Sequence, residues 1–228
     1  MTKATEMAEL ADSLLGSFKP FSQSLNGIKK ARTSGGYTSD KQNLPGNVDD
    51  LYVGGTCETM SMYWIVGDKA GLGTKKTGFI DWVLPTGMKG APDMGAVNVI
   101  ISKTVMYKAA GSKAASLGIT SHANFESDFF CRYGISDDHE RANGAAEVRA
   151  AITKPRNRYF MFTYSSDSGG HACAAMSSKM GDFAYFDPNY GEARLPVAAA
   201  MRRWYEGYLR ISGYSAKYST IYCDTWTY

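Results

Sequence analysis

Residues 159–187, YFMFTYSSDSGGHACAAMSSKMGDFAYFD, decide the fold class. Their first part, 159–164, is an aromatic and β-branched run that predicts a strand. Two further short strands are predicted at 171–176 and 183–187, around a turn in which Gly181 supplies a permissive backbone position. Three successive strands joined by short connections predict an antiparallel β-meander.

The best-defined helix of the sequence begins at Thr56. Threonine is a residue type that caps helix N-termini, and Glu58 places a negative charge in the first turn. Residues 60–66, MSMYWIV, are apolar on nearly every side, which is typical of a helix buried in the centre of a domain.

Further helices are predicted at 2–15, 143–152 and 196–209, the last with Pro196 in its first turn, and a final strand is predicted at 217–222. The expected fold class is α+β, with a central buried helix packed on an antiparallel β-sheet.

The polar stretch 22–47 contains few large apolar residues and is expected to be a loop or flexible arm. We therefore expect an N-terminal helix and arm over 1–46 and one folded domain over 47–228. Residues 75–155 give the least readable pattern of the chain.

Composition excludes several classes of protein. A net charge of +3 over 228 residues, without any block of five like charges, does not favour nucleic acid or acidic membranes as partners. No apolar run approaches the roughly 18 residues of a transmembrane segment, and the N-terminus lacks the apolar core of a secretory signal peptide. The four cysteines form no C-x-x-C pair, so neither a metal nor another cofactor is expected.

Cys57 is the candidate nucleophile because a helix N-terminus stabilises a thiolate. A thiolate nucleophile needs a histidine as general base, and the chain has three. His122 and His139 stand in polar surroundings and are expected to be solvated. His171 follows two glycines and opens a strand, so it is the best candidate. The other cysteines, Cys131, Cys173 and Cys223, are expected to be small buried core residues.

Asp187 is the candidate for the carboxylate that orients His171. A turn centred on Lys179 would place Asp187 directly opposite His171, within reach of the imidazole N–H. A slip of one residue would turn Asp187 to the wrong face of the sheet.

Three segments together resemble a family. They are Gly55-Thr56-Cys57 ahead of the apolar helix, Gly170-His171-Ala172 at a strand start, and residues 186–191, FDPNYG. This pattern is similar to the YopT-like effector proteases of bacteria, which are papain-fold enzymes with Cys, His and Asp in this order; it covers about a quarter of the chain. The resemblance implies a catalytic domain over 47–228 that cleaves a peptide or isopeptide amide through a thioester.

The chain departs from the papain-like pattern at the oxyanion hole. Leu51 and Tyr52 occupy positions where such enzymes have Gln or Asn, so Asn47 and Asp50 are the substitute candidates, with the Cys57 backbone N–H as the second donor.

Three functions remain open at this point. The first is a bacterial effector protease or toxin, secreted without a Sec signal and acting on protein in the cytosol of a target host cell, with a secretion-system component as a possible partner. The second is a papain-fold peptidoglycan amidase that cuts stem peptides in the bacterial periplasm as an antibacterial toxin, with an immunity protein as partner. The third is a non-catalytic binding module.

Overall fold

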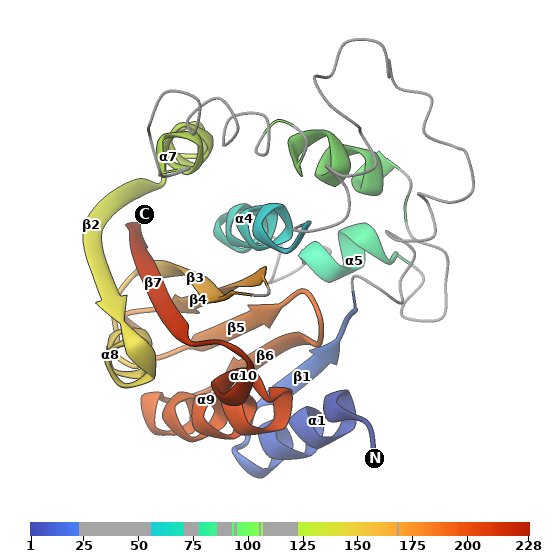
Figure 1. Cartoon of the computed structure of the whole chain (residues 1–228), viewed down its shortest axis with the longest axis vertical. Helices are drawn as coiled ribbons and strands as arrows, with labels where there is room; N and C mark the ends of the chain where they lie inside the picture. The colour runs from blue at the N-terminus through green and yellow to red at the C-terminus, as the bar shows by residue number, and fades with distance from the viewer. Residues whose placement is uncertain are drawn as a thin grey trace. The chain divides into compact units, whose positions relative to one another are not determined.

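A computed structural model of the chain describes residues 1–22, 56–70, 78–85, 93, 95–104, 106, 123–167 and 169–228 (Figure 1). The chain divides into two compact units, one formed by Met1–Ser22 with Gly134–Tyr228 and the other by Gln23–Tyr133. The N-terminal segment thus belongs to the unit that contains the C-terminal half. The functional division at residue 46 stays a prediction, and the arm expected at 22–47 lies almost wholly outside the described residues.

The first unit is built on a seven-stranded antiparallel sheet in the order β1-β6-β5-β4-β3-β7-β2. Its strands are β1 (Ser17–Pro20), β2 (Ser136–Asn143), β3 (Arg158–Ser166), β4 (Gly169–Ser177), β5 (Phe183–Asp187), β6 (Gly191–Leu195) and β7 (Thr220–Thr227). The predicted meander is confirmed as β3, β4 and β5, at the middle of the sheet.

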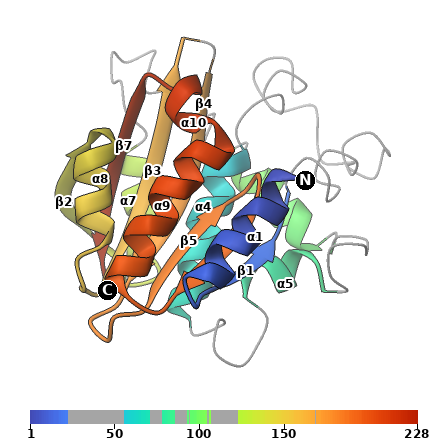
Figure 2. The same cartoon turned by 90° about the horizontal axis from the view of Figure 1, so that it is seen from below.

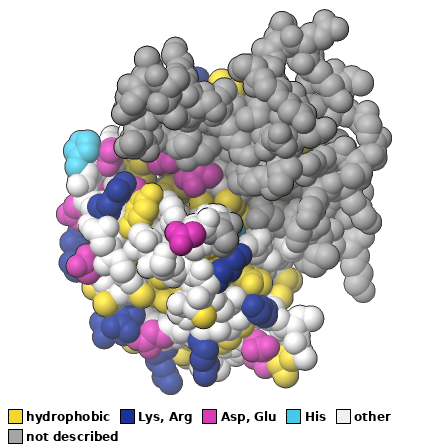
Figure 3. All heavy atoms as spheres, in the orientation of Figure 1, with side chains coloured by type: hydrophobic (Ala, Val, Ile, Leu, Met, Phe, Trp, Pro, Cys, Tyr) yellow, Lys and Arg dark blue, Asp and Glu magenta, His cyan; other side chains and the backbone are white. Residues whose placement is uncertain are grey.

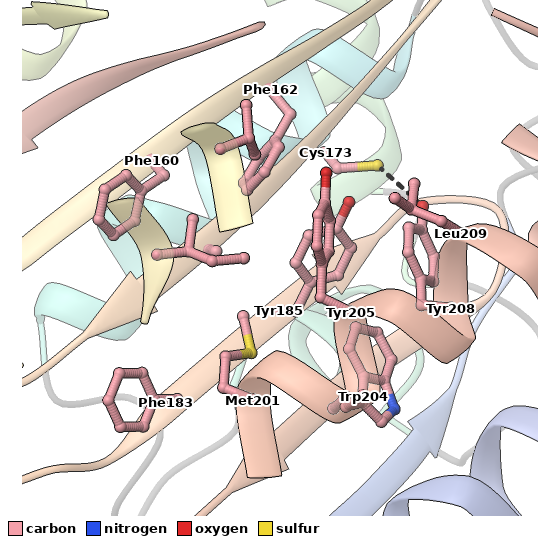
Figure 4. Close-up of a cluster of buried hydrophobic side chains, with 14 of the residues drawn as sticks. Phe160, Phe162, Cys173, Phe183, Tyr185, Met201, Trp204, Tyr205, Tyr208 and Leu209 are labelled. Atoms are coloured by element: carbon pink, nitrogen blue, oxygen red, sulfur yellow. Dashed lines mark hydrogen bonds between the residues drawn. The ribbon is translucent and has the colours of Figure 1, made fainter. Parts of the chain in front are cut away.

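Helices cover one face of this sheet. They are α1 (Lys3–Ser13), α8 (Gly144–Ile152), α9 (Ala198–Ser212) and the short α10 (Tyr214–Lys217). Figure 2 shows α8, α9 and α1 side by side across the strands. The core between the sheet and the helices is formed where alternate residues of the strands meet the buried face of α9 (Figure 4). Its largest members are aromatic: Phe160, Phe162, Tyr164, Tyr185, Trp204, Tyr205 and Tyr208.

The second unit contains α4 (Thr56–Lys69), α5 (Phe79–Val83), a helix at 95–104 and α7 (Ala123–Cys131). The helix predicted from Thr56 is confirmed as α4, and it is buried on most sides. Tyr63 packs against Trp82 at 5.7 Å and Phe129 at 5.3 Å between ring centroids, and the hydroxyls of Thr104 and Thr59 are hydrogen bonded at 3.0 Å.

Two predicted boundaries are wrong. Pro196 precedes α9, because Val197 is the N-cap and has an extended backbone. The final strand begins at Thr220 instead of 217, because the chain first makes the helical turn of α10 after Gly213, which has a positive φ of 77°.

The described surface carries both signs of charge. In the view of Figure 3, basic and acidic side chains are interspersed around the visible face, in keeping with the small net charge. Among the described residues, no helix is both long and apolar enough to span a bilayer.

Candidate active site

His171 and Asp187 form the central pair of the candidate site. The Nε2 atom of His171, on β4, lies 2.8 Å from Oδ1 of Asp187, the last residue of β5. Both side chains are buried, with exposed fractions of 4% and 1%. Nε2 is therefore engaged with the carboxylate, and Nδ1 is the ring nitrogen left to exchange a proton with a thiol.

The pair forms although the predicted register is wrong by two residues. The ladder between β4 and β5 pairs Ala174 with Phe186, so its continuation sets Cys173, rather than His171, opposite Asp187. A shift of two keeps every side chain on its original face, because successive strand residues alternate between faces. His171 consequently reaches Asp187 diagonally.

The electrostatics of the pair favour a charged imidazole. Burial of the ring opposes the imidazolium, but the Asp187 carboxylate and the hydrogen bond to it outweigh that effect, and with Cys173 they raise the pKa of His171 well above its usual value. This ring is suited to stabilise a thiolate as an ion pair and later to donate its proton.

Three donors converge on the Asp187 carboxylate. Oδ1 accepts the backbone N–H of Asn189 at 2.7 Å in addition to His171, and Oδ2 accepts the Tyr208 hydroxyl at 2.7 Å. The Asn189 side chain lies beside the ring, with Nδ2 at 3.4 Å from His171 Nε2, and donates to the Tyr214 hydroxyl at 2.8 Å. The Tyr214 ring also packs on the imidazole in a T-shaped arrangement, at 5.3 Å between centroids. The carboxylate is thus held by the turn, the strand and α9 together.

Cys173 lies in this cluster but is unsuited to be the nucleophile. Its side chain is buried, and desolvation raises the pKa of its thiol to about 11, so the thiol stays protonated near neutral pH. Ligand atoms of Cys173, His171 and Asp187 lie within 4.8 Å of one another. A metal there would have to displace a proton from this thiol and break the His171–Asp187 hydrogen bond, so these residues fit a hydrogen-bonded network better than a metal centre.

The other predicted site residues lie elsewhere. Cys57 is the second residue of α4, in the second unit, and is buried. His139 is solvated as predicted, with an exposed side chain 3.3 Å from an Asp137 oxygen. His122, Asn47 and Asp50 lie outside the described residues. None of the four cysteines forms a disulfide bond, and Cys131, the last residue of α7, is exposed rather than buried.

Comparison with known families decides the identity. Residues 17–220 match the Peptidase_C58 family, described as Yersinia/Haemophilus virulence surface antigen. The chain belongs to this family. It is therefore a cysteine peptidase of the YopT-like kind that the sequence motifs indicated, and its substrate is protein.

One solved structure shows the same fold for this peptidase. The Pseudomonas avirulence protein AvrPphB aligns with a TM-score of 0.58 at 16% identity, over 78% of this chain and 95% of that chain. The YopT domain of the Pasteurella multocida PfhB2 toxin aligns with a TM-score of 0.35 at 17% identity, over 94% of this chain and 92% of that chain. No curated protein sequence matches the chain. The papain-like α+β fold predicted from the sequence is confirmed.

Sequence reasoning missed Tyr208 and Asn189 as neighbours of Asp187. Tyr208 stands on the apolar face of α9, where it resembles an ordinary core residue. The signal that was present is its hydroxyl, because a tyrosine placed in a core needs a hydrogen-bond partner there. Asn189 follows Asp187 by two residues, a spacing at which an Asp side chain often accepts the backbone N–H.

Proposed function

We propose that Cys57 is the nucleophile of this peptidase, His171 its general acid and base, and Asp187 the carboxylate that orients His171. The observation that carries the proposal is the buried 2.8 Å hydrogen bond between His171 Nε2 and Asp187 Oδ1. It engages Nε2 with the carboxylate and leaves Nδ1 as the ring nitrogen that can act as base for a thiol. The order Cys, His, Asp along the chain supports the same assignment.

The proposed reaction has two steps. The Cys57 thiolate attacks the carbonyl carbon of a peptide or isopeptide amide, and the C–N bond breaks as His171 gives its proton to the leaving amine. Water then attacks the resulting thioester while His171 Nδ1 accepts the proton of the water, and the thiolate leaves. Each turnover thus returns the imidazolium and thiolate to their initial state.

The oxyanion formed in both steps needs two donors. The backbone N–H of Cys57 is the proposed first donor, because Cys57 lies in the first turn of α4. The proposed sources of the second are Asn47, through its side-chain amide, and Asp50, whose carboxyl can donate only when it is protonated. Alanine substitution at the position that supplies it should lower kcat by about 100-fold and leave Cys57 alkylation unchanged.

We also propose that the peptidase acts as a secreted virulence effector or toxin on protein in a target cell. The support is the family description as a virulence surface antigen, together with the names of the matched avirulence protein and toxin. Delivery without a Sec signal, and any secretion partner, belong to the same proposal.

The test is identification of cleavage products by mass spectrometry of newly formed N-termini. Parent protein and Cys57→Ser are added to eukaryotic cytosolic extract and to purified peptidoglycan, and Cys131→Ser serves as a control because it alters an exposed cysteine. New protein termini with the parent and Cys131→Ser, absent with Cys57→Ser, would support the proposal. Release of stem peptides from peptidoglycan alone would replace it with the amidase function, and an immunity partner would then be expected.

A further inference from the structure

We propose that Tyr208 is a positioning residue of this peptidase, whose hydroxyl holds the Asp187 carboxylate in the orientation that His171 requires. The inference rests on the proposed function of His171 and Asp187 and extends it to a residue of α9. It makes helix α9 part of the catalytic apparatus, although that helix lies outside the β4 and β5 segments that bear the pair.

The geometry separates the roles of the two carboxylate oxygens. Oδ1 accepts from His171 at 2.8 Å and from the Asn189 backbone at 2.7 Å, whereas Oδ2 accepts from Tyr208 at 2.7 Å. Rotation of the carboxylate about its Cβ–Cγ bond moves both oxygens and would misalign the hydrogen bond at Oδ1. The Tyr208 bond at Oδ2 opposes this rotation, so it keeps the hydrogen bond to the imidazole aligned.

Packing holds the Tyr208 ring rigidly in place. It stacks on Trp204 with centroids 5.1 Å apart and lies 4.7 Å from Tyr185, and Tyr214 meets it edge-on at 5.8 Å. A side chain fixed on several sides contributes its hydrogen bond without loss of rotamer freedom at each turnover. The hydroxyl is therefore preorganised toward Asp187.

The donor and the acceptor of each hydrogen bond around Tyr208 can be assigned. Tyr208 has a single hydroxyl proton and uses it in the hydrogen bond that it donates to the Asp187 carboxylate. The Tyr208 oxygen therefore accepts in its contact with the Cys173 thiol, 3.5 Å away (Figure 4). Burial, and next the charge of Asp187, raise the pKa of Tyr208 well above its usual value. The phenol accordingly remains a donor throughout the pH range of a cysteine peptidase.

Tyr205 provides a matched control on the same helix. It is buried in the same aromatic cluster, with its ring 6.2 Å from that of Tyr208, and its hydroxyl lies 3.3 Å from the hydroxyl of Tyr164. Tyr205→Phe thus removes a buried hydroxyl from the same core without touching a bond to Asp187. It measures the purely structural cost of the substitution.

The experiment follows the rate of Cys57 alkylation by iodoacetamide from pH 6 to pH 10, in a Cys131→Ser background that removes the exposed thiol. Tyr208→Phe is expected to react about five-fold more slowly than the parent at pH 6.5 and at the same rate at pH 10, because a less ordered carboxylate supports the imidazolium–thiolate pair less well. Tyr205→Phe is expected to match the parent throughout. In an Asp187→Asn background, Tyr208→Phe should cause no further slowing, because it acts only through the carboxylate.

Several results would overturn the inference. Equal rates for Tyr208→Phe and Tyr205→Phe, while His171→Ala and Asp187→Asn are slow, would remove Tyr208 alone and leave the proposed function intact. A parental rate in His171→Ala would overturn the proposed function and this inference with it. Slowing by Tyr208→Phe that persists in the Asp187→Asn background, or labelling of the normally buried Cys173, would show that the substitution acts through the fold and not through Asp187.

Discussion

Asp187 pairs directly with Gly191 across the hairpin formed by β5 and β6. The backbone of the carboxylate residue is therefore set by a turn that closes on a glycine, and the backbone N–H of Tyr190 within this turn bonds to the Asp187 carbonyl at 3.1 Å. Gly191 also pairs with Pro20, so the same residue links the site to the edge strand β1. The Asp-Pro-Asn-Tyr-Gly segment is thus a structural support of the site as well as the source of its carboxylate.

Substitution of Gly191 by alanine should strongly destabilise the protein. Gly191 has φ of 138°, and a Cβ there would overlap the carbonyl oxygen of Lys19. Gly169 has a nearly equal φ of 134° but open space around it, so Gly169→Ala measures the backbone strain by itself. We expect Gly191→Ala to lose at least about 2 kcal/mol more free energy of unfolding than Gly169→Ala in urea titrations. Equal losses would show that strand β1 gives way easily.

The Asp187 substitutions separate orientation from stability. Asp187→Ala leaves the buried donors of His171 and Tyr208 without their acceptor, at roughly 1–3 kcal/mol each, and also the partly buried N–H of Asn189, so this variant should be markedly destabilised. Asp187→Asn keeps the shape but can hold the ring in the wrong tautomer, so it should remain folded and lose activity on the order of a thousand-fold in kcat. Urea unfolding and turnover of the identified substrate measure the two effects. Near-parental turnover by Asp187→Asn would remove Asp187 from the proposed triad.

The contact between His171 and Asp187 was predicted from the sequence even though the predicted strand register was wrong by two residues. A register shift of two residues keeps both side chains on the same face of the sheet, so His171 still reaches the Asp187 carboxylate from a diagonal position. What could not be predicted depended on tertiary context. Strand β2 is so rich in charge that its sequence does not resemble a strand. Ion pairs between Arg141 and Asp224 and between Arg158 and Asp138 nevertheless stabilise it at the edge of the sheet. The contact of Tyr208 with Asp187 likewise joins residues whose proximity no local pattern encodes.

The stability of the protein should fall with rising pH because of His171. Its pKa is raised in the folded state, so the unfolded chain loses the proton first, near pH 6.5. The stabilisation is therefore complete below that pH and is lost as pH rises through the folded-state pKa, with a slope of about 1.4 kcal/mol per pH unit within this window. Parent and His171→Gln should show free energies of unfolding that approach each other as the pH rises above 6.5. A constant difference would mean that His171 is neutral in the folded protein.

The four cysteines should differ sharply in their reaction with iodoacetamide at pH 7. Burial raises the pKa of Cys173 to about 11 and that of Cys223 to about 12, so both should remain unmodified in the folded protein. Cys57 stands at the start of α4, where the helix N-terminus favours a thiolate, and it should be modified first. Replacing the exposed Cys131 by serine prevents competition for the reagent, and peptide mapping by mass spectrometry then gives the order.

His171→Ala should slow the modification of Cys57 at least about ten-fold at pH 7, whereas the exposed-histidine control His139→Ala should leave it unchanged. Loss of reactivity in His139→Ala instead, or in a variant of His122, would assign the base to another histidine.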